Sequence, residues 1–421
     1  MTKRTITMTQ GVALYMGAVL GSGILILPGY TADAAGPAAV ISWFLLSLLS
    51  IPIAYTFARL ALKYENYGGI ATIVQQAFGE RSGAVVGWFF FAWVATGQAV
   101  VGLTGASYIV TVFGLAGEWL YGFAFLFLVA ALAANLLGMR ISGLVSLGLS
   151  GIVLVLLVLT IGFSLPAMEA VHFRPFAPHG LTGIGQACVL IFWAFFGWES
   201  ITHLVPEFRN PQRDVMRCTW ASVFIIGAVY TLLSAVTIGT HTYGDIGTEA
   251  PLAALMNRAL GLNAGLATVV VACIVCLGTL NVYLASSSRL GYALADEGKL
   301  PRWFAKTSKS GTPYRSVFFL FVTNTLTLAF SYAASFSVDR LILVPTTLGI
   351  LVYIVASFAC VKLLWNDKAG RLAALTASAL CLAIAPFSMQ YLAVPAFVAA
   401  GCLLYLRYRR KASAASSLNK T

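Results

Sequence analysis

Long uncharged apolar runs constrain this chain more than any other feature. Residues 82–117 carry no charged side chain, and the same holds for 119–139, 141–168, 218–240 and 265–288. A helix needs about 20 apolar residues to cross the hydrocarbon core of a membrane, and each run meets or exceeds that length. Because 59% of the residues are hydrophobic and only 10% are charged, a soluble domain would lack the polar residues to cover its surface. The sequence therefore predicts an all-α membrane protein, since a β-barrel would show an alternating pattern instead.

The basic residues indicate how these helices are oriented. We predict twelve transmembrane helices, at roughly 9–34, 37–58, 83–112, 119–138, 141–165, 183–204, 218–239, 265–288, 316–335, 341–361, 372–386 and 390–406. With the N-terminus inside, only Arg174, Arg258 and Arg340 of the 26 Lys and Arg fall outside and the other 23 lie inside, which follows the positive-inside rule. The net charge of +12 could suggest a nucleic-acid partner, but the basic residues lie where the positive-inside rule places them. We therefore expect no nucleic-acid partner. We expect a multi-pass protein of a bacterial inner membrane, with both termini in the cytoplasm.

The seven cysteines lie within or at the ends of these spans, so we expect no disulfides. Cys273 and Cys276 have the spacing of half a metal site, but no second pair and no nearby His completes it. We interpret them as small packing residues, and we expect neither a metal nor a cofactor.

Glycine interrupts two of the spans, the first and the sixth. Helix one contains Gly21-Ser22-Gly23 and then Pro28, and helix six contains Gly197. Five-helix inverted repeats with broken first helices are a known way to build a substrate site at the membrane midplane. The sequence therefore predicts one transmembrane transporter domain over 1–421. Its parts are a first repeat (1–165), a second inverted repeat (183–362), an added helical hairpin (372–406) and a basic tail (407–421).

A broken helix leaves backbone groups without partners inside the helix. The half-helix that begins after Gly21-Ser22-Gly23 would direct free N–H groups and the positive end of its dipole at an anion, such as an α-carboxylate. The alternative is that these glycines only allow close helix packing.

Glu199 is the only acidic residue that the sequence places at mid-membrane depth. An intramembrane carboxylate is a functional hypothesis by default, because it could accept an ammonium group or carry a coupling proton. The alternative is a structural carboxyl that hydrogen-bonds to the broken helix.

Other residues near the two breaks are candidates for a substrate pocket. Trp193 and Phe196 could form an apolar wall in helix six, while Gln98 and Tyr283 are polar groups in helices three and eight. Each could equally serve only for packing or for bonds between helices. A sodium site at Ser287 is a further alternative, although serines in membrane helices commonly bond to their own backbone.

Three separated motifs carry a family resemblance. They are Gly21-Ser22-Gly23-Ile24; WAFFGWES at 193–200 with EFRNPQRD at 207–214; and SSRLGYALADEGKLP at 287–301 with Gly-Thr-Pro at 311–313. Together they resemble the amino acid–polyamine–organocation superfamily. Within it, they are most similar to bacterial exporters of methionine and branched-chain amino acids.

The resemblance implies a five-plus-five inverted-repeat fold with alternating access. It implies that Ser22 and Gly23 hold the substrate carboxylate, that backbone carbonyls near Phe195 and Phe196 hold the amine, and that Glu199 is a gating carboxylate. The expected substrate-binding residues are Gly21, Ser22, Gly23, Ile24, Gln98, Trp193, Phe195, Phe196 and Tyr283. Gln98 and Tyr283 depart from the Asn and Trp of arginine-exchanging relatives.

The sequence thus predicts a secondary active transporter rather than an enzyme. We expect export of neutral apolar L-amino acids (methionine, leucine, isoleucine and valine) coupled to H⁺, by a monomer or a homodimer in the lipid bilayer. The direction of transport rests wholly on the resemblance. Alternatives are an exchanger of cationic amino acids or polyamines, a membrane-embedded enzyme, and a partner-bound subunit or sensor.

Overall fold

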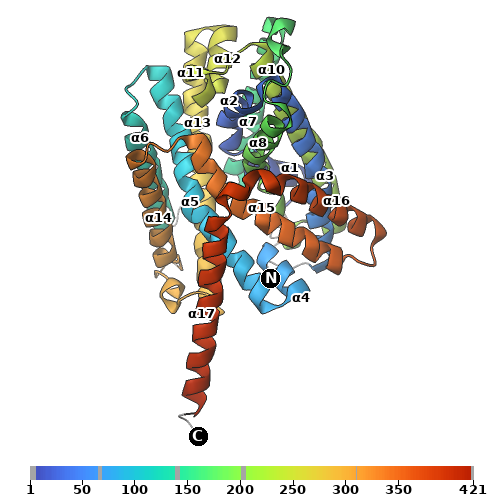
Figure 1. Ribbon diagram of the computed structural model, residues 1–421, viewed down its shortest axis with the longest axis vertical. Helices are drawn as coiled ribbons and strands as arrows, with labels where there is room; N and C mark the ends of the chain where they lie inside the picture. Colours follow the sequence, from blue (N-terminus) through green and yellow to red (C-terminus); the bar gives the residue numbers. More distant parts are fainter. Residues whose placement is uncertain (1–5, 65–68, 138–142, 201–204, 310, 419–421) are drawn as a thin grey trace.

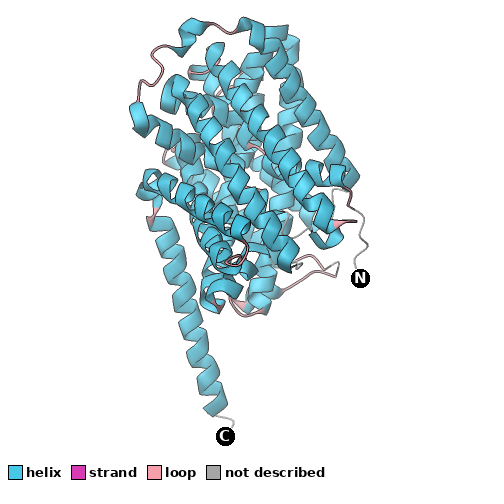
Figure 2. Ribbon diagram, turned by 90° about the vertical axis from the view of Figure 1, so that its right-hand side faces the viewer, coloured by secondary structure: helices cyan, strands magenta, loops and turns pink. Residues whose placement is uncertain are grey.

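The computed structural model describes residues 6–64, 69–137, 143–200, 205–309 and 311–418. Within these ranges the chain is built of helices (Figure 2), and the only β-type pairing is a single bridge between Ile6 and Phe208. The predicted all-helical fold is therefore confirmed.

The first five transmembrane helices occupy the first part of the chain. Helix one consists of two pieces, α1 and α2, and a short 3₁₀ turn at Gly36–Ala38 leads into α3. The elements are α1 (Met8–Val19), α2 (Gly23–Ala35), α3 (Ala39–Tyr64), the short α4 (Gly69–Phe78), α5 (Glu80–Phe113), α6 (Trp119–Leu136) and α7 (Gly143–Ser164).

The second part repeats this order of a broken helix followed by long ones. Helix six is α8 with two 3₁₀ turns after it, and 3₁₀ turns also occur at Leu165–Ala167, Ala170–Phe173, Val205–Glu207, Arg302–Ala305 and Ala385–Tyr391. The helices are α8 (Gly180–Phe192), α10 (Pro211–Gly239), α11 (Asp245–Glu249), α12 (Pro251–Leu260), α13 (Leu262–Asp296), α14 (Tyr314–Ala333), α15 (Val338–Leu363), α16 (Lys368–Ile384) and α17 (Ala393–Leu418).

The predicted spans overlap these helices, and helix one is the pair α1 and α2. The sixth predicted span (183–204) departs from its helix, because α8 ends at Phe192, 3₁₀ turns follow as far as Ser200, and 201–204 lie outside the described residues. Nine helical stretches among the described residues are long and apolar enough to cross a membrane, and the first of them, Gly23–Tyr64, joins α2 to α3. Several helices run past the predicted ends. With 35 residues, α13 is longer than the roughly 20 residues that a crossing needs. In Figures 1 and 2, α17 likewise extends out of the bundle.

The helices pack as two groups with α15 between them. One group contains α1, α2, α3, α8 and α10, and the other contains α5, α6, α13 and α14. Helix α15 contacts α5 on one side and both α3 and α8 on the other. Figure 1 shows α5, α6 and α14 at one side of the bundle and α3 and α10 at the opposite side. Both broken helices belong to the first group and face the second.

Side-chain burial suits a helix bundle surrounded by lipid. Large apolar side chains such as Phe44, Leu126, Phe224 and Phe330 are exposed on the outside, where a membrane would cover them. Many buried hydroxyls bond to the carbonyl four residues earlier in their own helix, as Thr237 does to Leu233 at 2.8 Å. Such bonds satisfy a polar group without a partner on another helix.

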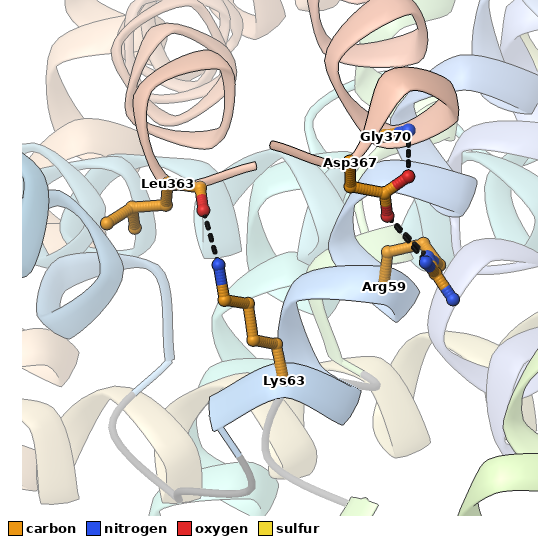
Figure 3. A network of polar contacts seen from close by, with 5 residues as sticks. All are labelled: Arg59, Lys63, Leu363, Asp367 and Gly370. Carbon is orange, nitrogen blue, oxygen red and sulfur yellow. Dashed lines mark hydrogen bonds and ion pairs between the residues drawn. The ribbon is translucent and has the colours of Figure 1, made fainter. Parts of the chain in front are cut away.

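A polar network joins one end of α3 to the corner between α15 and α16 (Figure 3). Arg59 Nε donates to Asp367 Oδ2 at 3.0 Å, and Lys63 Nζ donates to the carbonyl of Leu363 at 2.7 Å. Asp367 also caps α16, because its Oδ1 accepts from the N–H of Gly370 at 3.1 Å. The hydrogen bond from Arg59 holds the pKa of the Asp367 carboxyl below its ordinary value.

Candidate functional site

The first break interrupts helix one for three residues. Helix α1 ends at Val19 and α2 begins at Gly23, with Ser22 as its N-cap residue. The Ser22 side chain makes no capping hydrogen bond, although the residue is only 2% exposed. The first N–H groups of a helix have no acceptor within it. This end of α2 therefore directs hydrogen-bond donors and a positive dipole end toward the middle of the bundle.

The second break, in helix six, is longer and its backbone is less regular. Helix α8 ends at Phe192, a 3₁₀ turn covers Trp193–Phe195, and Phe196 is extended with ψ 145°. Gly197 follows with φ +122°, a backbone conformation that side chains other than glycine rarely adopt. A Cβ at this position would also lie 2.8 Å from the carbonyl oxygen of Ala18. Glycine thus allows the second break to approach the first.

The two breaks touch each other directly. A Cβ added at Gly23 would lie 2.9 Å from Cβ of Ala194, so the start of α2 fits against helix six only because residue 23 is glycine. Tyr230 of α10 joins the same two segments. Its hydroxyl donates to the carbonyl of Val19 at 2.7 Å and also lies 3.2 Å from the carbonyl of Ala194. One buried hydroxyl therefore contacts a backbone carbonyl on each side.

Glu199 lies within the second break and is 5% exposed. Its Oε2 accepts from the N–H of Gly197 at 2.9 Å and from the hydroxyl of Tyr353 on α15. The carboxylate thus stabilises the break itself and joins it to α15. This geometry is compatible both with a gating carboxylate and with a structural one.

A small cavity lies between the breaks and helices α5 and α13. Its volume accessible to water is about 20 Å³, which is enough for one or two water molecules. Seven of the nine predicted substrate-binding residues line it, namely Gly21, Ser22, Gly23, Gln98, Trp193, Phe196 and Tyr283. The remaining lining residues are Ala18, Val19, Trp93, Val101, Ala194 and Thr279, so the lining carries no charged side chain.

The other predicted site residues lie outside this lining. Ile24 is fully buried in the core, and Phe195 packs against Tyr230 with ring centroids 5.1 Å apart. Ser287 is fully buried on α13, and its hydroxyl has no hydrogen-bond partner among the described residues. Over all the ranges that the structure describes, no group of three or more His, Cys, Asp or Glu is placed to hold a metal ion.

Trp93 of α5 is the main lining residue that sequence reasoning missed. Its ring centroid is 4.5 Å from that of Phe196, 5.7 Å from Tyr283 and 6.2 Å from Trp193. It is therefore the centre of an aromatic wall contributed by three helices. In the sequence, Trp93 follows Phe89-Phe90-Phe91, and nothing local distinguishes it from these neighbours.

Two further glycines make room for the aromatic wall. A Cβ at Gly349 of α15 would lie 2.1 Å from the ring of Phe196, and one at Gly97 of α5 would lie 2.7 Å from the ring of Trp193. The rings thus lie directly on the backbone of neighbouring helices. Larger residues at either glycine would force a ring to move.

Gln98 is the polar group of the cavity wall. Its side chain is 2% exposed, and its Oε1 has no hydrogen-bond partner among the described residues. Buried polar atoms in proteins nearly always have a partner. A ligand or a water molecule in the cavity could supply one.

Comparison with known proteins agrees with this architecture. The model of the amino acid permease family matches residues 6–412. An uncharacterized amino acid permease of Bacillus subtilis, YecA, is 36% identical over 406 residues, which cover 96% of each chain. The L-methionine/branched-chain amino acid exporter YjeH of Escherichia coli is 29% identical over 397 residues, or 90% of each chain.

A solved structure shares the fold. The crystal structure of MhsT in complex with L-phenylalanine has a TM-score of 0.64 and 13% sequence identity, and the match covers 92% of this chain and 100% of that one. The fold is thus that of a multi-pass transporter with broken helices one and six. Because the family model matches residues 6–412 and the YecA permease is 36% identical over 96% of this chain, the chain belongs to the amino acid permease family.

Proposed function

We propose that this permease exports neutral apolar L-amino acids, above all methionine, leucine, isoleucine and valine, from the cytoplasm of a bacterium in exchange for H⁺. The observation that carries the substrate class is the lining of the cavity. It combines the backbone of two helix breaks with an aromatic wall and with no charged side chain. An amino acid with an apolar side chain matches the chemistry of each of these parts, and the side chains that line the cavity would move apart to admit it, since the present volume of about 20 Å³ holds only water.

The two breaks suggest how such a substrate would bind. Its carboxylate would accept from the N–H groups at the start of α2, next to Ser22 and Gly23. Its ammonium group would donate to carbonyls of helix six near Phe195 and Phe196 and to Gln98 Oε1, which has no partner among the described residues. Its side chain would contact Trp93 and Tyr283. Every polar group of the substrate would then be paired, as binding in a dry site requires.

Direction and coupling rest on separate grounds. Export is proposed because the exporter YjeH is similar over 90% of this chain. Coupling to H⁺ is proposed because Glu199 is a buried carboxylate at the second break, joined to α15 through Tyr353. Protonation would weaken the bonds that the carboxylate accepts and would release α15 from the break. Both termini would lie in the cytoplasm, on the side where most basic residues gather.

Counterflow in proteoliposomes tests the substrate class. Vesicles loaded with unlabelled methionine or leucine should accumulate labelled methionine, whereas vesicles loaded with arginine, putrescine or glutamate should not. Accumulation driven by arginine or putrescine instead would favour the alternative of a cationic amino acid or polyamine exchanger. Replacement of Na⁺ by choline should change nothing, and a dependence on Na⁺ would favour an ion site at Ser287.

The variant Glu199→Gln tests the coupling. We expect exchange of methionine for methionine to continue, because Gln can still accept from Gly197 and Tyr353, while uptake driven by a pH gradient falls by roughly tenfold or more. The matched control is Glu118→Gln, which removes an exposed carboxylate at the start of α6 and should leave both assays unchanged. Gradient-driven uptake by Glu199→Gln at the wild-type rate would remove Glu199 from proton coupling.

A further inference from the structure

Asn324 of α14 makes an unusual set of contacts with α5. The side chain is fully buried, and its Oδ1 accepts from the backbone N–H of Ala99 at 2.9 Å. Its Nδ2 donates to the carbonyl of Val94 at 3.1 Å and to the carbonyl of Leu320, in its own helix, at 2.7 Å. Both N–H bonds and one acceptor of the amide are therefore used, and two of these three bonds reach the backbone of α5.

The contact with Ala99 is notable because that residue lies in the middle of a 34-residue helix. The N–H of such a residue normally donates to the carbonyl four residues earlier in the same helix, here Ala95. A side chain that inserts into this ladder changes the local geometry of a helix. The amide of Asn324 thus joins two backbone groups of adjacent turns, from Val94 to Ala99.

The turn that Asn324 holds is the one that faces the cavity. Trp93 directly precedes Val94, Gln98 directly precedes Ala99, and both Trp93 and Gln98 line the cavity. Gly97 lies in the same turn and contacts the ring of Trp193. A small rotation of this backbone segment would therefore move the aromatic centre of the wall and its polar group together.

We propose that Asn324 is a positioning residue, which fixes the turn Val94–Ala99 of α5 and thereby sets how Trp93 and Gln98 face the substrate. The proposal rests on the proposed function, because it takes the cavity to be the amino acid site. Asn324 touches no lining side chain in any hydrogen bond and acts only through the backbone of α5. It determines the shape of the pocket from outside.

A purely structural role is the competing explanation. Buried polar side chains commonly join membrane helices and contribute stability without affecting a site. Ser331, on the same helix, is such a residue: it is fully buried, lies within 3.3 Å of the Tyr121 hydroxyl of α6, and donates to the carbonyl of Phe336 at 2.8 Å. Ser331→Ala is therefore the matched control.

The test compares Asn324→Leu with Ser331→Ala in proteoliposomes. Leucine has the shape of asparagine but makes none of its hydrogen bonds, so both contacts with the backbone of α5 are lost. The readout is the ratio of kcat/KM for methionine to kcat/KM for alanine, because this ratio does not depend on how much of the protein is folded. We expect Asn324→Leu to change the ratio by roughly tenfold and Ser331→Ala to leave it at the wild-type value.

A double-mutant cycle adds a second readout. If Asn324 acts through Gln98, the effects of Asn324→Leu and Gln98→Ala on the KM for methionine should not add, since the second change removes what the first displaces. Should Asn324→Leu fail to fold, Asn324→Ala takes its place in both measurements. A wild-type ratio together with additive effects would overturn the proposal.

The same variants separate the two proposals. If the wild type shows no methionine counterflow, the proposed function fails; if it does but Gln98→Ala keeps wild-type kinetics for every amino acid tested, the cavity is not the substrate site. If Gln98→Ala raises the KM while the Asn324 variant behaves like Ser331→Ala, the site stands and only the positioning role of Asn324 is lost.

Discussion

Helices one and six are both interrupted beside the cavity, but the residues at the two breaks differ in chemistry. The break in helix one lasts three residues, is made of Leu20, Gly21 and Ser22, and presents the N-terminal end of α2. The break in helix six extends at least from Trp193 to Ser200, and it carries bulky aromatics and the buried Glu199. The first break presents the N–H groups at the start of α2, whereas the second contains a carboxylate that accepts from Gly197 and Tyr353.

We relate this difference between the breaks to the two charged ends of the proposed substrate. A zwitterion has one end that accepts hydrogen bonds and one that donates them, and under the proposed function each break would bind one of these ends. Small residues at the first break would let the backbone approach the substrate carboxylate, while the aromatics of the second would contact the substrate side chain. Variants that change each break, and the contact between them, separately should differ in their effects on transport.

The largest effect is expected from Gly23→Val at the first break. A Cβ at this position would lie 2.9 Å from Cβ of Ala194, so the start of α2 must move away from helix six. We expect methionine counterflow to fall by roughly a hundredfold, because a shift of about 1 Å in a binding group has effects of this size.

Gly21→Ala is the control within the same break. The nearest atom to an added Cβ there is Oγ1 of Thr279 at 3.6 Å, an ordinary contact. This variant should lose much less counterflow than Gly23→Val, because the helix itself need not move. Equal losses in the two variants would mean that any change at the break is harmful, and the specific role of Gly23 would be lost.

A smaller effect is expected from Tyr230→Phe, which changes the contact between the breaks. The variant removes only the hydroxyl that reaches the carbonyls of Val19 and Ala194. A buried hydrogen bond contributes about 1 kcal/mol, and 1.4 kcal/mol corresponds to a factor of ten. The KM for methionine should therefore rise by roughly fivefold to tenfold in transport assays.

Tyr15→Phe controls for the loss of a buried hydroxyl as such. The hydroxyl of Tyr15 joins α1 to α10 through Thr219 at 2.9 Å, away from the two carbonyls that Tyr230 contacts. Its removal should lower the melting temperature and leave the KM unchanged. The same KM in Tyr230→Phe as in Tyr15→Phe would show that the breaks do not depend on their shared hydroxyl.

The smallest effect on transport is expected far from both breaks, at Asp367. Asp367→Ala removes the cap of α16 and the partner of Arg59. Loss of a helix N-cap costs about 1 kcal/mol, and an exposed ion pair adds less than that. We expect a lower melting temperature at pH 7 and unchanged methionine counterflow.

The pH dependence of this effect has a defined sign. Because the pKa of Asp367 is lowered in the folded protein, its contribution to stability is present above the ordinary Asp pKa of about 3.9. The contribution is lost as the pH falls through the lowered pKa. The difference in melting temperature between wild type and variant should therefore shrink between pH 7 and pH 3. A difference that stays constant over this range would contradict the assigned ion pair.

The sequence predicted the helices and the two breaks well, because both have local signals. Charge-free runs mark the spans, and glycines mark the breaks at Gly21-Ser22-Gly23 and Gly197. The short helices α4, α11 and α12 were not predicted, because 5 to 10 residues between spans give no periodic pattern.

The residues that complete the site could not be predicted in this way. Tyr353 and Glu199 are 154 positions apart, Tyr230 and Val19 are 211 apart, and Asn324 and Ala99 are 225 apart. Nothing in a local pattern of hydrophobicity indicates which distant hydroxyl or amide will meet a given backbone group. Only the packing of the helices brings these groups together.

The most direct test of the account is a cryo-electron microscopy structure of the protein with methionine bound. We expect density in the cavity, with the carboxylate against the N–H groups at Ser22 and Gly23, the amine toward the break in helix six, and the side chain against Trp93. Methionine density at any other place, or in the cavity with its carboxylate directed away from α2, would contradict it.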